Sequence, residues 1–486
     1  MFNFLSAKYK SSYMSIGRPI EYISFCLLSA VVTALLIKVG TKGNIILVIS
    51  AISATILILC ISNISIGFYS LLILGFIIGS LGRLVPTSFP LSSIVLMVPY
   101  GLFFIVIIKS VLKNDRSWVV WHPITYGYFI TTFYLIVEIF NPQMGSFIGW
   151  LSYFRGALSN VLLFFITCYI LKDLKNIRFL IKFIFALILF TALYGCSQQW
   201  FGFPTFEIRW IVSDPHVAQL YSLPGGGIRK FSFLTDPANF GTLMASGGIG
   251  ALILSLGPFK TNKKVILFVS AGIILLGMSY SGTRTAYIMV PAGLALYSLM
   301  TIYKRATKLL AMIGGFALLG LLFTPIYGNV TLNRFRSAFQ PPSDDASYSI
   351  RTYHRELMRP YMHEHPLGGG MNTTAGPGIK YNPNHYLAGF PPDSAYFSTA
   401  LESGWVGLLL ECIFYFAILF YCVHYFYKSS DREIKIYYAT IAAMLFSLML
   451  GSYTQFTINS LPQGLVFFPL LACIIKLNKF DTSIIK

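Results

Sequence analysis

The chain has 486 residues, of which 56% are apolar, 16% aromatic and only 11% charged. Because soluble proteins carry about 25% charged residues, this composition excludes an ordinary soluble domain and indicates a polytopic helical membrane protein. The formal net charge of +19 does not indicate a nucleic-acid partner, and we expect none, since membrane proteins collect Lys and Arg in their cytoplasmic segments. The seven cysteines lack CxxC spacing and predict neither a disulfide framework nor a zinc site.

Fourteen apolar stretches follow one another along the chain. A helix of about 20 residues crosses the hydrocarbon core of a bilayer, and a helix satisfies its own backbone hydrogen bonds there. We therefore predict an all-α membrane protein with about 14 transmembrane helices (12–14), folded as a single membrane domain over residues 1–486. No small-residue cleavage site follows the first stretch, which is expected to remain as a span. The spans are expected near 21–38, 44–62, 66–84, 91–112, 118–140, 149–171, 178–197, 238–256, 264–282, 285–303, 308–325, 404–427, 435–455 and 460–477.

Charge predicts the orientation of these spans. With the N-terminus in the cytoplasm, most cations of the short connections fall on cytoplasmic segments, and few fall outside. This is the asymmetry of the positive-inside rule. It predicts that both termini are cytoplasmic and that the two long loops, 198–237 and 326–403, are external. We expect short helices in the second loop.

One polar segment stands out between the late spans, at about residues 325–407. It holds six of the 36 Lys and Arg residues and four of the seven His residues. External arginines run against the orientation preference, so they require a local reason. Arg155 is further unusual because it lies inside the sixth span. An ionisable group within the membrane is a functional candidate, although a structural pairing with Glu138 or a carbonyl is an equal alternative.

The first external stretch, residues 224–241, combines three consecutive glycines at 225–227, Arg229 and the dipeptide Asp236-Pro237. Asp followed by Pro is typical of a helix N-cap and first helical position, so we expect a structural role for Asp236. Glycines permit a close backbone approach, and Arg229 beside them is interpreted as an anion contact.

The second stretch is a tight turn around Arg284, between two spans. This arginine could extend to lipid headgroups. Alternatively, its guanidinium and the hydroxyls of Ser281, Thr283 and Thr285 would form a phosphate clamp, because guanidinium matches phosphate geometry.

The third stretch begins with residues 349–359, which we expect to form a helix that ends at Pro360. Arg351, Arg355 and Arg359 recur every four residues and so share one helix face, which favours an anion beside them. The following His-Glu-His at 363–365 lacks the HExxH spacing of a zinc site, and we expect no metal.

Asp393 directly precedes an apolar helix. It is interpreted either as an N-cap or as a general base whose pKa the arginines could tune. His385 and Glu402 are alternative bases, and His354 is a further candidate on the acceptor side.

Together these stretches resemble the O-antigen ligase/polymerase superfamily of bacterial polysaccharide assembly, over about residues 225 to 410. The resemblance rests on four motifs in the family's order. These are Arg229 with Asp236-Pro-Ala-Asn239, Ser281-Gly-Thr-Arg284, Arg351 followed by Pro366-x-Gly368-x-Gly370, and Asp393-Ser394-x9-Gly404-x2-Gly407. One departure matters, because ligases of the family place His at the position of Asp393. That departure favours a polymerase over a ligase.

The resemblance implies a GT-C-like, metal-independent, inverting glycosyltransferase without a cofactor. Its donor would be a glycan on polyprenyl (undecaprenyl) diphosphate, presented at the outer face of the bacterial cytoplasmic membrane. The implied partners are this lipid-linked glycan, membrane lipid and, as a further candidate, a chain-length regulator. Asp393 would accept the proton of the acceptor hydroxyl. The diphosphate would be held by Arg284 and Arg351 together with Arg229 or Arg355, and Arg155 is a further candidate.

Three other functions are compatible with the sequence, one of which is a non-catalytic scaffold of the cell envelope. A ligase would transfer the finished polymer, O-antigen or exopolysaccharide, to an acceptor. A transporter of lipid-linked sugars is a function of another class. Transporters are typically built from internal repeats with charges at the membrane midplane, whereas this chain concentrates its unusual charges near the outer face.

Overall fold

The computed structural model of the chain describes residues 63–84, 91–223, 226–326, 328–340, 342 and 346–481. The expected spans at 21–38 and 44–62 lie outside the described residues. By its internal contacts the chain divides into two units, residues 1–67 and 68–486. The site and the contacts discussed below belong to the second unit.

The described residues form helices, and within them the only β-type pairing is a single bridge between Ser222 and Ile228. This confirms the all-α fold class. Ten described helices are long and apolar enough to cross a membrane, and the expected spans 285–303 and 308–325 coincide with α12 and α13, which are not among these ten. The long helices are α3 (Ile64–Leu84), α4 (Ser92–Lys113), α5 (Pro123–Val137, extended by the 3₁₀ turn Glu138–Phe140), α6 (Phe147–Ile170), α7 (Leu174–Trp200), α10 (Pro237–Ser255), α11 (Thr261–Tyr280), α12 (Arg284–Met300), α13 (Arg305–Phe323), α17 (Ala395–Lys428), α18 (Arg432–Gly451) and α19 (Gln463–Phe480).

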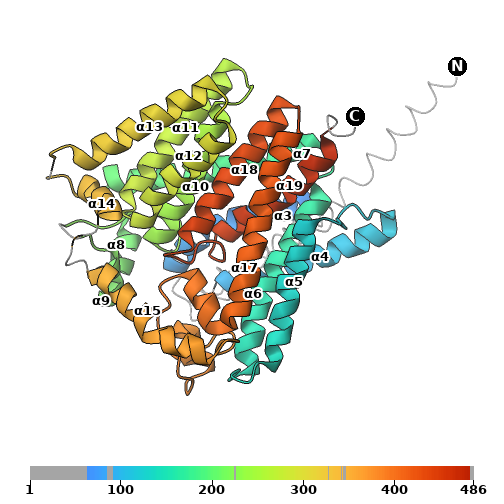
Figure 1. Cartoon of the computed structure of the whole chain (residues 1–486), viewed down its shortest axis with the longest axis vertical. Helices are drawn as coiled ribbons and strands as arrows, with labels where there is room; N and C mark the ends of the chain where they lie inside the picture. Colours follow the sequence, from blue (N-terminus) through green and yellow to red (C-terminus); the bar gives the residue numbers. More distant parts are fainter. Residues whose placement is uncertain are drawn as a thin grey trace, which may run out of the picture. The chain divides into compact units, whose positions relative to one another are not determined.

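Three of these helices, α10, α18 and α19, form the centre of the bundle, and each is about 83% buried over its apolar window. Helix α10 packs against α7, α11, α12 and α18, and Figure 1 shows it beside α11, α12 and α18. Its small residues allow this, because a Cβ added at Gly248 would lie 2.5 Å from Leu275 and one at Gly250 would lie 2.5 Å from Met444. Close helix packing through small residues is typical of membrane bundles.

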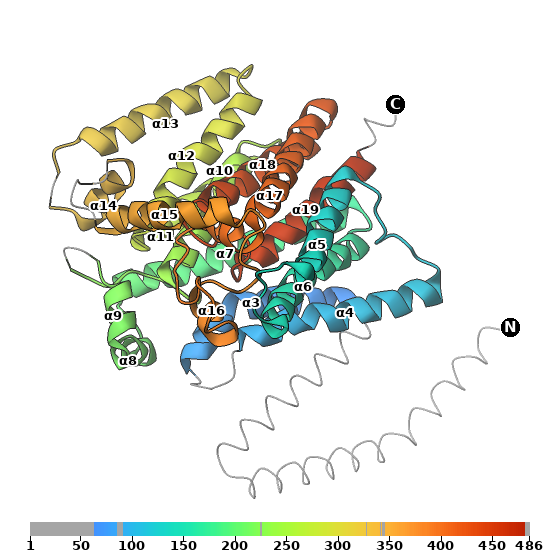
Figure 2. The ribbon, with the colours of Figure 1, turned by 60° about the horizontal axis from the view of Figure 1, so that its bottom comes forward.

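The two long loops contain the remaining helices. The first loop holds α8 (Thr205–Ser213) and α9 (Pro215–Tyr221), and the second holds α14 (Val330–Phe339), α15 (Ala346–Glu364) and α16 (Ala375–Tyr381). Figures 1 and 2 show where these short helices lie beside the bundle.

Contacts place both long loops at the same end of the bundle. In the first loop, the carbonyls of Leu234 and Ser232 accept hydrogen bonds from the Arg83 guanidinium at the end of α3, at 2.6 and 2.8 Å. In the second loop, Leu367 O accepts from Asn141 Nδ2 of the α5–α6 turn at 2.9 Å. Arg83 is therefore a structural cation that ties a helix end to a loop.

The opposite end of the bundle carries charge pairs between helix ends. Lys172 lies 2.6 Å from Asp115, and Arg178 lies 2.7 Å from Glu433. The hydrogen bond from Lys172 is the largest of the causes that lower the pKa of Asp115 to about 2. Surface pairs of this kind contribute only about 0–1 kcal/mol each, so they mark this end of the bundle more than they stabilise it.

Helix α15 differs from the prediction that it ends at Pro360. It continues through this proline to Glu364. A proline inside a helix removes one backbone hydrogen bond and crowds the preceding turn. The helix continues because residues on both sides of Pro360 are anchored: Met358 and Tyr361 are buried and pack in one cluster with Leu387 and Leu401.

Two signature glycines bring the second loop onto helix α17. Gly404 has φ +64° at a kink inside α17, and a Cβ there would lie 2.0 Å from Pro366 O. Gly368 has φ +77°, and its added Cβ would lie 2.5 Å from Gly404 N. Both positions therefore require glycine, for a left-handed backbone and for a backbone contact. The hydrogen bond from Trp405 N to Pro366 O, at 2.9 Å, closes the same junction.

We predict that Gly368→Ala destabilises the folded protein by about 1–3 kcal/mol, the cost of a strained backbone residue. The loop must also move away from α17, so activity is expected to fall together with stability. Thermal unfolding in detergent measures the effect. The matched control is Gly376→Ala, because a Cβ at Gly376 would meet nothing within 4 Å. Equal unfolding temperatures for the two variants would contradict the proposed junction.

Candidate functional site

Arg229 contacts the turn before α12. Its Nε donates to Ser281 O at 2.9 Å, and its NH2 group donates to Thr283 Oγ1 at 2.9 Å. Thr283 in turn donates to Pro237 O at 3.0 Å. The first loop, the start of α10 and the turn before α12 are therefore joined through one arginine.

Asp236 has the structural role that the sequence predicts. Its side chain caps α10 by accepting a hydrogen bond from Asn239 N at 2.8 Å, and Pro237 occupies the first helical turn. The Asn239 amide also donates to Asp236 Oδ2 at 2.6 Å. The hydroxyls of the turn are likewise engaged within the protein, because Ser281 Oγ donates to Met278 O at 2.7 Å.

A second arginine, Arg334 of α14, reaches the same turn. Its Nε donates to Gly282 O at 3.0 Å. Burial, and then the positive charge of Arg334, lower the pKa of Arg229 to about 10. Arg229 thus remains charged at neutral pH, and two guanidinium groups lie close enough to repel each other. Such an arrangement is favourable when an anion binds between them. Sequence reasoning did not select Arg334, although its position in an external loop was a usable signal.

His354 and Asp393 form a pair. The His354 Nδ1 atom on α15 lies 2.8 Å from Asp393 Oδ2 just before α17. The two side chains are 17% and 27% exposed, so the pair is partly open to a substrate. Ser394, and not Asp393, is the N-cap of α17, since its side chain accepts from Phe397 N. The Asp393 carboxylate is therefore available to the imidazole.

The turn after α18, residues 452–454, connects these parts. Ser452 O accepts from Ala395 N at 3.0 Å. The Tyr453 hydroxyl accepts from Arg355 at 3.1 Å, and the guanidinium lies 4.8 Å over the tyrosine ring. The Thr454 hydroxyl lies 2.5 Å from that of Thr285. This turn was not predicted to be part of the site. Three consecutive hydroxyl residues at an expected external span end were the signal that could have identified it.

The remaining predicted arginines lie around this turn. Arg284 is the first residue of α12 and is followed by Thr285, which contacts the 452–454 turn. Arg351 lies on α15 one helical turn before Arg355. Both side chains are half-buried. The 452–454 turn thus joins three segments: the start of α12, α15 and the start of α17. These segments carry five of the predicted site residues, namely Arg284, Arg351, Arg355, His354 and Asp393.

Glu402 and His385 have different surroundings. Glu402 is buried, and its Oε1 accepts from Thr374 N at 3.1 Å and from the Thr374 hydroxyl at 2.5 Å. It therefore holds the second loop against α17. His385 lies against Gly369, where an added Cβ would be 2.7 Å from its ring. Burial, and then the neighbouring His365, lower the pKa of His385, which favours a neutral ring.

Arg155 lies apart from the other arginines. It lines a separate cavity of about 870 Å³ together with Lys380 and Tyr381 of α16. Glu138, its suggested structural partner, instead accepts a hydrogen bond from Asn141 at 2.8 Å. The predicted diphosphate-binding arginines therefore do not all converge on one place.

An apolar groove of about 1000 Å³ extends between α11, α12 and α13. Leu275, Leu294 and Leu318 are among its lining residues. At one end it reaches Tyr287 and Phe335, whose rings pack edge to face at 5.3 Å. Phe335 follows Arg334 in α14, so this groove ends next to the arginine pair.

In the described part of the chain, no group of three or more His, Cys, Asp or Glu side chains could hold a metal ion.

Comparison with known proteins finds a family model that matches part of the chain. Residues 266–412 match the sequence model of the O-antigen ligase family. The matched segment contains Arg284, Arg351, His354 and Asp393, together with the Gly368–Gly404 junction, and Arg229 lies before it. No curated protein matches the chain. Members of the matched family are glycosyltransferase-like enzymes that act on lipid-linked glycans. The arginine-rich end of this membrane bundle, from α11 to the middle of α17, therefore matches the sequence model of the O-antigen ligase family, which is consistent with the resemblance to the O-antigen ligase/polymerase superfamily.

Proposed function

We propose that this protein polymerises polyprenyl-diphosphate-linked oligosaccharide repeat units at the outer face of the cytoplasmic membrane. The product would be an O-antigen or an exopolysaccharide. The observation that carries the proposal is the His354–Asp393 pair, joined through the 452–454 turn to the segments that bear Arg284, Arg351 and Arg355. A proton acceptor and several guanidinium groups are the two components that glycosyl transfer from a diphosphate requires.

The donor would bind with its diphosphate among the arginines and its lipid tail in the apolar groove. Arg229 and Arg334 already converge on the turn before α12, and Arg284 begins that helix. The groove between α11, α12 and α13 ends beside Phe335 and offers apolar surface to the polyprenyl chain. Guanidinium groups bind diphosphate oxygens through paired hydrogen bonds, so they can take the charge-neutralising role that a metal ion has in other glycosyltransferases.

In the reaction, the acceptor hydroxyl would lose its proton to His354 Nε2 while its oxygen attacks the anomeric carbon of the donor. The bond from that carbon to the diphosphate oxygen breaks, and the electron pair leaves with the polyprenyl diphosphate. Asp393 accepts the hydrogen bond of Nδ1–H and stabilises the imidazolium that forms. Attack opposite the leaving group inverts the anomeric configuration. The arginines offset the charge that develops on the diphosphate.

This assignment gives Asp393 a different role from the one expected from the sequence. Imidazole is the side chain whose charge ordinarily changes between pH 5 and 8, so it suits proton transfer at neutral pH. Ligases of the family place His at the position of Asp393, whereas here a histidine from α15 contacts that position. We propose that His354 replaces the family histidine in function and that Asp393 orients it.

Ligation is the second candidate, because the matched family is described as O-antigen ligase. Deletion of the gene in the source organism distinguishes the two activities, because the loss of each leaves a different molecule on the lipid carrier. Loss of a polymerase leaves single repeat units on the carrier, whereas loss of a ligase leaves full-length polymer there. Mass spectrometry of the extracted carrier lipids distinguishes them. Full-length polymer on the carrier would contradict the polymerase proposal.

The orientation of the chain belongs to the same proposal. We place both termini in the cytoplasm and both long loops outside, in accordance with the distribution of cations. Cysteine accessibility tests this orientation. A single cysteine at Asn384, in the second loop, should react with a membrane-impermeant maleimide in intact spheroplasts, and one at Lys260, in the α10–α11 turn, should not.

A further inference from the structure

Arg155 and Lys380 are two cations that the site described above does not use. They line one cavity of about 870 Å³ formed by α4, α6, α16 and the turn before α19, and the residues that line it include no Asp or Glu. The cavity is therefore a positively charged space. Arg155 Nε is buried and has no hydrogen-bond partner among the described residues. A buried donor without a partner is unfavourable by about 1–3 kcal/mol, which indicates that an acceptor is missing from the cavity.

Tyr381 links the two cations. Lys380 Nζ lies 4.8 Å over the Tyr381 ring. The Tyr381 hydroxyl accepts a hydrogen bond from Ser152, one helical turn from Arg155, at 3.3 Å. That hydrogen bond and the charges of Lys380 and Arg155 lower the pKa of Tyr381. Lys380 and Arg155 thus act on the same tyrosine hydroxyl at the wall of one cavity, an arrangement that suits an anion with more than one charge.

The rim of the cavity is apolar on one side. Helix α4 contributes Ile94, Leu96 and Met97 to the lining. Ile94 and Met97 are also among the exposed large apolar residues, at 42% and 40% exposure. Helix α4 is one of the ten membrane-spanning candidates, so this side of the cavity faces the lipid. An anion with a hydrocarbon tail could enter laterally from the membrane.

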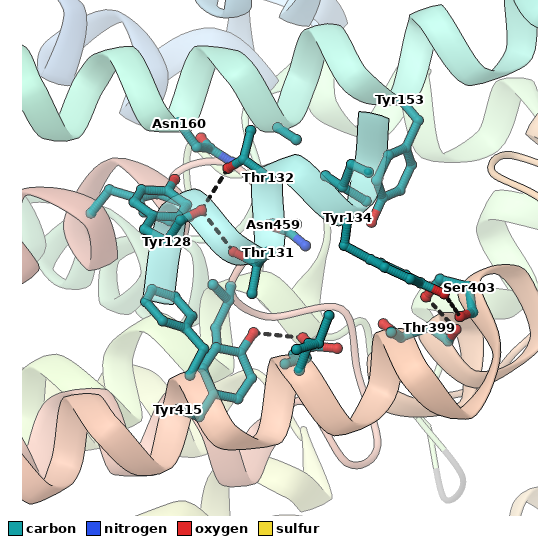
Figure 3. Close-up of a pocket in the computed structure, with 18 of the residues that line it drawn as sticks. Tyr128, Thr131, Thr132, Tyr134, Tyr153, Asn160, Thr399, Ser403, Tyr415 and Asn459 are labelled. Carbon is teal, nitrogen blue, oxygen red and sulfur yellow. Dashed lines mark hydrogen bonds between the residues drawn. The ribbon is translucent and has the colours of Figure 1, made fainter. Parts of the chain in front are cut away.

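On its inner side the cavity adjoins a smaller chamber of about 130 Å³ (Figure 3). Tyr153, Asn160 and Asn459 line both spaces. The chamber carries hydroxyls, amides and aromatic rings from α5, α6, α17 and the turn before α19, as the labelled side chains in Figure 3 show. This combination is suited to sugar, because hydroxyl groups pair with polar side chains and apolar ring faces pack on aromatic ones.

One carboxylate of the chamber is incompletely bonded. Glu411 Oε1 accepts from the Tyr415 hydroxyl at 2.7 Å. Its buried Oε2 and the buried Tyr128 hydroxyl make no hydrogen bond of normal geometry to the described residues. Buried polar groups are usually satisfied, and a hydroxyl-rich ligand would supply both missing partners.

The chamber lies beside the first turns of α17. Thr399, on its wall, is five residues after Ser394 in α17, and a rise of 1.5 Å per residue places it roughly 8 Å along the helix from the residue that follows Asp393. A sugar that fills the chamber therefore lies near the helix start that follows Asp393. The donor groove between α11, α12 and α13 involves none of the residues that line the chamber.

We propose that this cavity and chamber form a second lipid-diphosphate site, which binds the acceptor repeat unit. Arg155 and Lys380 bind the diphosphate, α4 contacts the polyprenyl chain, and the chamber binds the sugar. This inference rests on the proposed polymerase function, in which both substrates carry the same lipid diphosphate and so require two sites of similar chemistry. An ordinary anionic phospholipid has the same chemistry, and the experiment must distinguish the two.

The experiment counts bound undecaprenyl diphosphate by native mass spectrometry, with the full chain in phosphatidylcholine nanodiscs. We expect two molecules per chain in the wild type and one in the double variant Arg155→Gln/Lys380→Gln. Lys113→Ala, at the other end of α4, is the matched control and should retain two. Thermal unfolding establishes that the double variant is folded, and each single variant is measured as well in case it is not.

Kinetics with purified lipid-linked repeat units provide the second readout. Each single variant should raise the KM for the acceptor about tenfold, which corresponds to the loss of about 1.4 kcal/mol of binding, with kcat unchanged. A wild type that elongates repeat units, together with a double variant that has the same acceptor KM, would overturn the second site but leave the polymerase proposal intact. A wild type that does not elongate at all would overturn both.

Nanodiscs containing phosphatidylglycerol give the last comparison. If the double variant loses only bound phosphatidylglycerol and retains two undecaprenyl diphosphates, the cavity is a phospholipid site and the inference is wrong.

Discussion

His354→Gln is expected to lower kcat for glycosyl transfer by about 10²–10⁴-fold, the usual contribution of a positioned general base. Glutamine retains a polar side chain of similar size that can still hydrogen-bond to Asp393, so the fold should be preserved. Initial rates with purified lipid-linked repeat units, at one fixed pH, provide the measurement.

Two further variants make this result specific to the His354–Asp393 pair. His363→Gln changes an exposed histidine of the same helix, and it should retain the wild-type rate. Asp393→Asn should reduce kcat, because the imidazole of His354 loses its orienting carboxylate. The activity that remains should still require His354. If Asp393→Asn abolished turnover and His354→Gln had no effect, Asp393 itself would be the base.

Arg284→Ala is expected to reduce kcat/KM by about 10²–10³-fold, the cost of removing one group that stabilises charge in the transition state. Arg284 begins α12 beside the turn that Arg229 and Arg334 both contact, so its loss removes positive charge from the proposed diphosphate site. Cells that carry the variant should accumulate single repeat units on the lipid carrier, which carrier extraction and mass spectrometry detect.

The control for Arg284 is Arg209→Ala, since Arg209 is an exposed arginine on α8 of the other long loop. It should leave polymer length and yield unchanged. Arg284→Lys separates simple charge from guanidinium geometry, because lysine provides a point charge without the planar fork. Full activity of Arg284→Ala would exclude this residue from diphosphate binding.

The sequence predicted the features of this protein that depend on local composition. Apolar runs predicted the long helices, and the dipeptide Asp236-Pro237 predicted the start of α10, because these signals act within one or two turns of chain. The resemblance also identified Gly368 and Gly404, each as part of a different motif. The structure adds the physical reason, which is a direct approach of their two backbones.

Contacts between distant segments could not be predicted in this way. His354 and Asp393 are 39 residues apart and meet only because α15 packs over the start of α17. The 452–454 turn joins three segments that no spacing relates. Pro360 signals a helix end, but buried neighbours on both sides of it carry α15 onward. Tertiary packing, which a local pattern does not encode, determined each of these outcomes.

The separation of Arg155 from the other arginines could not be predicted for the same reason. A sequence shows that a cation lies in a span, but not which neighbours surround it. In the structure it faces Tyr381 and a cavity of its own, so the cations expected to form one diphosphate site are divided between two. A polymerase requires two lipid-linked substrates, and this division is compatible with that requirement.

The central claim is that one chain joins two lipid-linked repeat units by using the His354–Asp393 pair. The most direct measurement reconstitutes the purified protein in liposomes with the lipid-linked repeat unit as the sole substrate and resolves the products by gel electrophoresis and mass spectrometry. Our account predicts a ladder of carrier-linked oligomers that wild type produces and His354→Gln does not. Unchanged single repeat units with the wild type, or an equal ladder with the variant, would contradict it.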